Sequence, residues 1–282
     1  MSLSFWKMSG AGNDFIVLNP RVSEIPAPIA EFVRRVCTRR LSAGADGVIL
    51  VEPSESREAD VRIRFFNPDG GEFDTCGNGS RCAARFAHET GLAPAEFTMA
   101  TGAGPVTAVV RGDRVRIGFT DPRRLDLSVA VTADGERRSG HRVEFGVPHF
   151  VLVVDRLPEG AIEPEARAIR NARELAPEGA NVNYVEVEGR RDLAVRTYER
   201  GVEGETLACG SGCVSTSIAL AAAGLVEPPV RVRTRSGAVL EVDFTRSGDR
   251  FTGITLEGDA RVIYRAELGP DATEWPGAPR SP

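Results

Sequence analysis

The stretch Thr75-Cys76-Gly77-Asn78-Gly79-Ser80 recurs in the second half of this 282-residue chain as Ala208-Cys209-Gly210-Ser211-Gly212-Cys213. The same spacing carries Thr101 to Thr234 and Gly104 to Gly237. Side-chain identity between the halves is low, but glycines and apolar runs keep their places, as a shared backbone geometry requires. The sequence therefore predicts an internal duplication with one cysteine-containing turn in each half.

Short β-type runs dominate both halves. In the first half they are residues 15–18, 48–51, 61–66, 106–110 and 115–119, and in the second half 150–154, 184–187, 193–198, 239–244 and 251–256. Apolar residues at a helical spacing predict a helix over 29–38, which matches 164–172 in the second half.

Two further helices are expected to begin at the cysteines. A run rich in small residues follows each one, and Gly91 and Gly224 beyond these runs are suited to end a helix. The second of these helices is apolar on nearly every face, and such a helix is normally buried. We expect an α+β fold of two pseudo-symmetric domains, each a curved, mainly antiparallel sheet wrapped around a central helix. The active site is expected in the interdomain cleft.

The repeat also predicts the domain boundaries. The N-terminal repeat covers residues 1–120 and is completed by a C-terminal segment, 265–282. The C-terminal repeat covers 121–264, and the chain crosses between the domains at Asp121-Pro122-Arg123-Arg124.

Composition favours a small-molecule site. The net charge is −5 and acidic and basic residues are interspersed, so we expect neither a nucleic-acid partner nor a membrane surface. No apolar run approaches the roughly 20 residues that span a bilayer. Five cysteines, an odd number, argue against a disulfide scaffold and favour a reducing cytoplasm.

The glycines around each cysteine let backbone N–H groups of a helix's first turn approach a ligand. Such N-termini attract anions, and a carboxylate is a natural guest. The same positive end favours a thiolate, whereas burial opposes it. Two thiols on opposite faces of one carbon supply the base and the acid that a racemase needs. No cofactor is then required, because hydrogen bonds at the helix ends stabilise the carbanion.

Other interpretations of the cysteines are weaker. A single buried cysteine beside glycines is usually a small core residue, and we assign that role to Cys37, Cys82 and Cys213. A zinc site is disfavoured, because the cysteines lack paired knuckle spacings and no histidine is near them in sequence. We expect no bound metal. A Cys76–Cys209 disulfide formed on oxidation would be inactive.

A set of motifs along nearly the whole chain resembles the diaminopimelate epimerase family. In order they are Lys7-Met8-Ser9-Gly10-Ala11-Gly12-Asn13-Asp14-Phe15, Gly44-Ala45-Asp46-Gly47, Phe66-Asn67-Pro68-Asp69-Gly70, Cys76-Gly77-Asn78-Gly79, Asn181-Val182-Asn183, Glu199-Arg200-Gly201 and Ala208-Cys209-Gly210-Ser211-Gly212. The resemblance implies a two-domain, homodimeric, cytoplasmic enzyme. Its reaction is the cofactor-independent interconversion of LL- and meso-diaminopimelate in lysine and peptidoglycan synthesis, by a two-cysteine acid/base mechanism.

The resemblance also implies roles for individual residues. The two acid/base thiols are those of Cys76 and Cys209. The groups that bind the α-carboxylate are Asn78, Ser211 and the backbone at Gly77 and Gly210. The remaining polar groups of the diamino acid fall to Asn13, Asn67, Asn183 and Arg200, with Arg200 pairing with the distal carboxylate as a bidentate fork. Two more residues are implied near the reacting centre and its amino group, the supporting His149 and Glu199.

The chain departs from the family pattern at three positions: Val147 stands where Asn is usual, Ser9 replaces the usual His, and Glu203 is extra. Val147 keeps open a related two-thiol racemase that acts on a different amino acid. A non-catalytic ligand-binding or thiol-redox protein is the third hypothesis.

Overall fold

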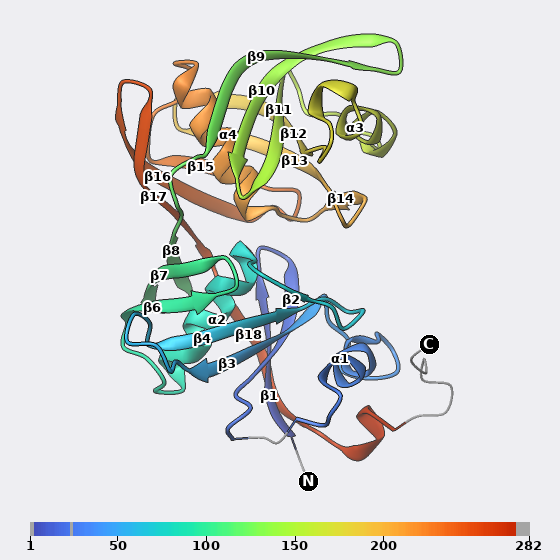
Figure 1. Ribbon diagram of the computed structural model, residues 1–282, viewed down its shortest axis with the longest axis vertical. Coiled ribbons are helices and arrows are strands. Elements are labelled where there is room, and N and C mark those ends of the chain that lie inside the picture. The colour runs from blue at the N-terminus through green and yellow to red at the C-terminus, as the bar shows by residue number, and fades with distance from the viewer. Residues whose placement is uncertain (1–2, 23–24, 275–282) are drawn as a thin grey trace. The chain divides into compact units, whose positions relative to one another are not determined.

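The computed structural model describes residues 3–22 and 25–274. It comprises two compact units, residues 1–117 with 258–282, and residues 118–257 (Figure 1). The return to the first unit thus begins at Gly258, upstream of the expected residue 265, because the boundary falls inside strand β17 (Arg250–Asp259). The part of the expected C-terminal segment that covers 275–282 lies outside the described residues.

The first unit contains two helices, α1 (Ile29–Cys37) and α2 (Gly77–Glu89). Its strands are β1 (Leu3–Gly10), β2 (Asn13–Leu18), β3 (Gly47–Pro53), β4 (Val61–Phe66), β5 (Glu72–Phe73), β6 (Glu96–Thr101), β7 (Gly104–Arg111), β8 (Arg114–Gly118) and β18 (Arg261–Leu268). A short 3₁₀ helix, η2 (Pro270–Ala272), follows β18.

The second unit repeats this order with α3 (Glu163–Arg170) and α4 (Gly210–Ala222). Its strands are β9 (Arg124–Ala133), β10 (Glu136–Phe145), β11 (Val147–Val154), β12 (Asn181–Gly189), β13 (Asp192–Glu199), β14 (Gly204–Thr206), β15 (Val230–Arg233), β16 (Val239–Ser247) and β17. A short 3₁₀ helix, η1 (Arg173–Leu175), follows α3. Both expected pairs of helices are confirmed, and the expected β runs all lie in strands except for Phe119, which follows β8.

Strand pairing confirms the duplication. In the first unit β1 pairs antiparallel with β2, β2 parallel with β3, β3 antiparallel with β4, and β4 parallel with β6. In the second unit β10, β11, β12, β13 and β15 repeat these pairings in the same order and sense. Even the register recurs, since Phe15 lies opposite Gly47 and Phe150 lies opposite Val182. Strand β18 pairs antiparallel with β1, just as β9 pairs antiparallel with β10. In the first unit, β18 therefore has the place that β9 has in the second.

Left-handed backbone geometry recurs at equivalent glycines. Gly44 and Gly179 have φ angles of 66° and 67°, and Gly91 and Gly224, just after the central helices, have 76° and 77°. L side chains rarely adopt such angles, so both copies of the repeat keep glycine there.

In each unit, helices pack against both faces of the sheet. On one face of the first unit, α1 contributes Phe32, Val33 and Val36 to a core shared with Ile16 and Leu18. The matching face of the second unit holds α3 and a core that includes Phe150, Tyr184 and Tyr198. Each fully buried side chain of this size contributes about 1.5–3 kcal/mol relative to exposure.

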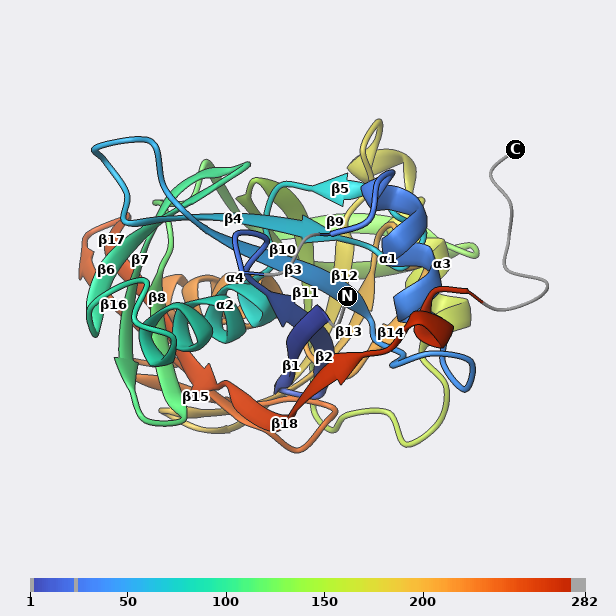
Figure 2. The ribbon, with the colours of Figure 1, turned by 90° about the horizontal axis from the view of Figure 1, so that it is seen from below.

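The other face of each sheet curves around a central helix. Strands β1, β2, β3, β4 and β7 pack on α2, and strands β10, β11, β12, β15 and β16 pack on α4 (Figures 1 and 2). Nearly every residue of α4 is buried, as its all-round apolar sequence predicts. The structure therefore presents the first turn of each central helix at a fixed place on its own sheet. Among the described residues, no helix is long and apolar enough to cross a membrane.

Candidate active site

Cys76 is the N-cap of α2, as the sequence predicts. Its extended backbone (φ −149°, ψ 115°) lets its carbonyl accept the first helical hydrogen bond, from the N–H of Ser80 at 2.7 Å. The N–H of Gly79 points at the sulfur, 3.4 Å away. A thiol at this position lies at the positive end of the helix, where negative charge is favoured.

The amide of Asn13 faces the Cys76 thiol from the start of β2. The thiol donates to Asn13 Oδ1 over 3.9 Å, while Asn13 Nδ2 donates to Asp46 Oδ2 over 2.9 Å. Because Asp46 accepts from the amide nitrogen, the oxygen of Asn13 is directed toward the sulfur. We call Asn13, Cys76, Gly77 and Asn78 the first half-site.

Asn67 lies in a tight turn after β4. Its backbone N–H donates to Gly71 O and its carbonyl accepts from Gly70 N–H, both at 2.9 Å. Its side chain is exposed. The contacts that fix Asn67 are thus those of its own turn, and its role toward a substrate stays a prediction.

Cys209 is the N-cap of α4 and mirrors Cys76. Its carbonyl accepts from Cys213 N–H at 3.0 Å, and its sulfur lies 3.5 Å from Ser211 Oγ. Burial, and next the negative charge of Glu199, raise the pKa of the Cys209 thiol well above its ordinary value. Of the two opposing effects expected from the sequence, burial prevails at this cysteine, which carries its proton at neutral pH.

Glu199 ends β13 beside Cys209. Its carboxylate accepts a hydrogen bond from the Thr206 hydroxyl, and its negative charge raises the pKa of the Cys209 thiol, so it is not a solvated surface charge. Burial raises the pKa of the Glu199 carboxyl group, although part of the residue remains exposed. A carboxylate with a raised pKa near a thiol is a candidate acid/base group.

Glutamine in place of Glu199 is expected to stabilise the protein at neutral pH and to accelerate alkylation of Cys209. The folded state holds the proton of this carboxyl group more tightly than the unfolded chain does. The contribution of Glu199 to folding stability therefore falls as the pH rises above 4.5, the ordinary pKa of a glutamate, and through the raised pKa. Thermal unfolding at pH 4 and pH 8 should show a gain that appears only at the higher pH. A variant that is less stable than the wild type at pH 8 contradicts the burial of the charge.

His149 is fully buried on β11 and contacts Ser211. Burial lowers its pKa to about 3, so the ring is neutral at pH 7. Its Nε2 lies 3.1 Å from Ser211 Oγ, and its Nδ1 lies 3.2 Å from Nδ2 of Asn183. The oxygen of Asn183 accepts from the Thr197 hydroxyl at 3.0 Å. We call His149, Asn183, Glu199, Cys209 and Ser211 the second half-site.

The neutral His149 predicts a loss of stability in acid. A histidine whose pKa is depressed on folding stabilises the fold fully above pH 6.5, and this contribution is lost as the pH falls toward 3, by about 1.4 kcal/mol per pH unit. Replacing His149 by Gln should make the free energy of unfolding, measured with urea, depend less on pH between pH 4 and 7. His88→Gln, at the end of α2, is the matched control, and equal slopes in all three proteins would contradict the assignment.

Arg200 follows Glu199, and its backbone is held by Asn181, which lies beside His149. Its backbone N–H donates to Asn181 Oδ1 at 2.7 Å, and Asn181 Nδ2 lies 3.5 Å from His149 Nε2. The Arg200 guanidinium donates to the carbonyl of Glu178 at 3.1 Å. The Arg200 guanidinium, which is expected to bind a distal carboxylate, thus has one of its donors bound to the Glu178 carbonyl in this structure.

The structure adds residues that the sequence reasoning did not single out. They are Asp46, Arg81, Asn181, Thr197 and Thr206, each of which forms a hydrogen bond with a predicted site residue. Asp46 and Asn181 stand in motifs quoted above, which is the only signal that could have found them. Among the residues described, no group of three or more His, Cys, Asp or Glu side chains could hold a metal ion.

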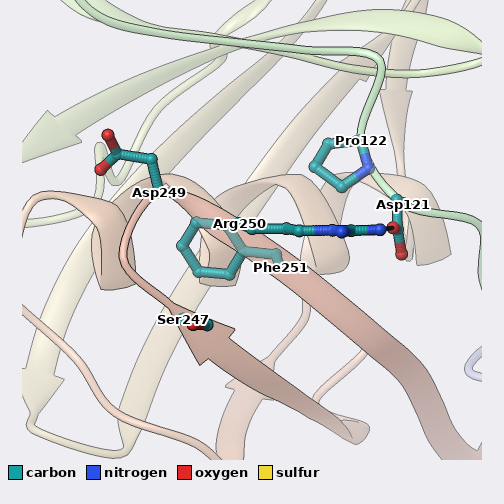
Figure 3. A pocket seen from close by; sticks show the side chains of 6 residues that line it. All are labelled: Asp121, Pro122, Ser247, Asp249, Arg250 and Phe251. Carbon is teal, nitrogen blue, oxygen red and sulfur yellow. Dashed lines mark ion pairs between the residues drawn. The ribbon is translucent and has the colours of Figure 1, made fainter.

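A surface hollow elsewhere in the second unit has a volume of about 510 Å³. It lies at the β16–β17 hairpin and is lined by Asp121, Pro122, Ser247, Asp249, Arg250 and Phe251 (Figure 3). Arg250 and Asp121 approach to 3.9 Å. The lining contains no thiol, histidine or amide, so this hollow lacks the groups found at the cysteine turns.

Comparison with known proteins gives a consistent result. The family model of diaminopimelate epimerase matches residues 5–123 and 142–263. The chain is 38% identical to the diaminopimelate epimerase of Aquifex aeolicus, covering 97% of this chain and all of that one. It is 41% identical to that of Chlorobaculum tepidum, covering 93% and 99%.

Solved structures resemble the fold at lower identity. A probable proline racemase from Agrobacterium radiobacter aligns with a TM-score of 0.68 at 19% identity, over 96% of this chain and 95% of that one. A PhzF-family phenazine biosynthesis protein from Bacillus anthracis aligns with a TM-score of 0.69 at 14% identity, over 95% and 99%. These likenesses confirm the α+β architecture of two sheet-and-helix repeats.

Proposed function

Because this chain belongs to the diaminopimelate epimerase family, we propose that it interconverts LL- and meso-diaminopimelate without a cofactor. The observation that carries the proposal is the pair of N-cap cysteines. Each lies at the first turn of a central helix, and each is followed by a glycine and a polar side chain, Asn78 or Ser211. A small diamino acid is the substrate class that this pair suits.

The proposed reaction is a proton exchange at one carbon. A thiolate of one cysteine removes the α-hydrogen, and the electrons of the broken C–H bond pass into the adjacent carboxylate. The thiol of the other cysteine then gives its proton to the opposite face of the same carbon. One S–H bond forms and one breaks, so the pair is restored with its roles exchanged and can catalyse the reverse reaction.

The negative charge that develops on the substrate needs hydrogen-bond donors. We assign this role to the N–H groups of the first turns of α2 and α4, together with Asn78 and Ser211. The absence of side chains at Gly77, Gly79, Gly210 and Gly212 supports a close approach of the carboxylate to the backbone.

The other polar residues bind the rest of the diamino acid in this proposal. Asn13, Asn67 and Asn183 supply amides, Glu199 lies near the α-amino group and Cys209, and Arg200 pairs with the distal carboxylate. His149 supports Ser211. The contact of Asn13 with Cys76, and the effect of the Glu199 charge on the pKa of Cys209, support these assignments.

A stereochemical assay tests the function. LL-Diaminopimelate should be converted to a mixture with the meso form by the purified protein alone, as measured by chiral chromatography. In D₂O, diaminopimelate should gain α-deuterium, and proline and lysine should not. If another amino acid gains deuterium in its place, the substrate class changes, and Val147, at the start of β11, is the first position to examine. Without exchange in any amino acid, the enzymatic hypothesis fails.

We also propose that the enzyme acts as a homodimer in the cytoplasm, as its family resemblance implies. Light scattering of the purified protein should give twice the mass of the 30.3 kDa chain. A monomer of full activity would contradict the dimer and leave the chemistry untouched.

A further inference from the structure

Arg81 is a buried cation close to the Cys76 turn. It lies on α2 and is 0% exposed. Its guanidinium donates through Nη2 to Asn78 Oδ1 at 3.0 Å, through Nη1 to the carbonyl of Gly77 at 3.2 Å, and through Nε to the carbonyl of Asp259 at 3.2 Å. Burying a charge is costly, and a cation near a helix N-terminus gains nothing from the helix dipole. Helix stability therefore does not explain why an arginine stands here.

The contact with Arg81 fixes the orientation of the Asn78 amide. A guanidinium has only donors, so the atom of Asn78 that it contacts must be the oxygen. The NH₂ group of the amide then points away from Arg81 with its two hydrogens. Since Asn78 is itself only 4% exposed, packing holds this orientation. The result is a side chain that offers hydrogen-bond donors, the kind of group that binds a carboxylate.

The second half-site reaches the same result with different residues. Val214 occupies on α4 the position that Arg81 has on α2, and Ser211 replaces Asn78. Here His149 supplies the fixed donor. Asn183 turns its oxygen to Thr197 and its NH₂ group to His149 Nδ1 and to the carbonyl of Phe150, so Nδ1 accepts and the proton lies on Nε2.

Ser211 Oγ therefore accepts from His149 Nε2, and its own hydrogen is directed elsewhere, toward Cys209 Sγ or a bound anion. The longer approach of Asn181 Nδ2 to Nε2, 3.5 Å, joins two donors and does not compete. In both units, then, a buried residue makes the side chain two positions after the cysteine a donor.

We propose that Arg81 is a positioning residue for the reaction, acting through Asn78: it turns the amide so that its N–H groups face the α-carboxylate of the substrate. This inference rests on the proposed function. It assigns to Arg81 the part that His149 has in the other half of the duplicated fold, although the two residues come from unrelated positions of the repeat.

A double-mutant cycle in the full chain tests the proposal, with KM and kcat for LL-diaminopimelate and the unfolding temperature as readouts. Arg81→Met should raise KM about ten- to hundredfold, the range for a hydrogen bond to a charged group. In an Asn78→Ala background the same change should leave KM unaltered, because the residue through which Arg81 acts is gone. Arg85→Met, one turn further along α2, is the control and should leave KM unchanged.

Asn78→Asp keeps the test decisive if Arg81→Met folds poorly. The aspartate retains an oxygen for Arg81 and forms an ion pair with it, so the unfolding temperature should be maintained. The new side chain has no N–H group, so KM should rise at least a hundredfold. Arg81→Lys, which keeps the charge without the fork, should fall between the wild type and Arg81→Met.

The outcomes separate the two claims. An active wild type in which Arg81→Met raises KM equally in both backgrounds, or in which it lowers only the unfolding temperature, overturns the positioning role and leaves the function standing. A wild type that leaves LL-diaminopimelate unchanged overturns the proposed function, and this inference with it.

Discussion

Alanine in place of Cys76 or Cys209 is expected to lower kcat/KM for epimerisation by roughly 10²- to 10⁴-fold or more, since each removes an acid/base group that no neighbour replaces. Each variant should still exchange the α-hydrogen of one stereoisomer with D₂O, because the remaining thiol can remove and return a proton on its own face. The two variants should act on opposite stereoisomers. Chiral separation followed by mass spectrometry measures both effects.

Two other cysteines provide matched controls for this experiment. Cys82 and Cys213 are buried on the same helices, and burial raises the pKa of Cys82 to about 12. Cys82→Ala and Cys213→Ala should therefore change stability by the cost of a small cavity and leave the stereochemistry intact. Full epimerisation by Cys76→Ala or Cys209→Ala, or an equal loss in the controls, would contradict the assignment of the two thiols.

The second large effect is expected at Gly212. A Cβ atom there would lie 2.5 Å from Asn183 Oδ1, 3.2 Å from Cys209 Cβ and 3.3 Å from Thr197 Oγ1. Asn183 cannot yield easily, because its amide is held by Thr197 and His149. Gly212→Ala should cost about 1–3 kcal/mol of stability through overpacking. It should also reduce activity about a hundredfold, because it displaces the groups that hold Ser211.

Gly204→Ala is the control for this substitution. Gly204 lies on β14 in the same unit, and an added Cβ there would meet nothing within 4 Å. Urea unfolding and kcat/KM should both stay close to the wild type. If Gly212→Ala behaves like Gly204→Ala in both measurements, the packing around Asn183 is looser than the structure requires.

The duplicated architecture could be predicted from the sequence because backbone geometry constrains glycines. The paired turns at Gly44 and Gly179, and at Gly91 and Gly224, need left-handed angles that other residues rarely adopt. Both halves of the chain therefore have glycine at these positions, whereas most other side chains differ between the halves. The two N-cap cysteines follow from the same reasoning, since a glycine-rich turn before an apolar run marks the start of a helix.

Strands β9, β10 and β18 were not anticipated. Much of their surface is exposed, and charged residues interrupt the apolar pattern of β10 and β18. Strand β9 does carry alternating apolar residues, Leu125, Leu127, Val129 and Val131, and could have been predicted from them. They form because distant partners supply their hydrogen bonds, as β1 does for β18. The boundary between the two units at Gly258 falls within a continuous strand, β17, so no turn marks it in the sequence.

The parts of the half-sites that the sequence did not reveal depend on contacts between distant residues. Arg81 and Arg85 look alike in a helical pattern, but one is fully buried and the other is partly exposed. Both donate to carbonyls of a distant segment, Arg81 to that of Asp259 and Arg85 to that of Ala260, and no local pattern reveals these contacts. Likewise, burial and next the charge of Glu199 raise the pKa of Cys209, and the sequence alone shows neither the burial nor the proximity of Glu199 to the sulfur.

The proposed mechanism requires two thiols that act on opposite faces of one carbon, and the position of deuterium tests this directly. Early in the conversion of LL-diaminopimelate in D₂O, the meso product should carry one α-deuterium, while the recovered LL substrate should remain protiated. The thiol that removes hydrogen is then distinct from the one that delivers deuterium. Deuterium that enters the recovered substrate as fast as the product would show a single base, and would contradict the two-thiol mechanism.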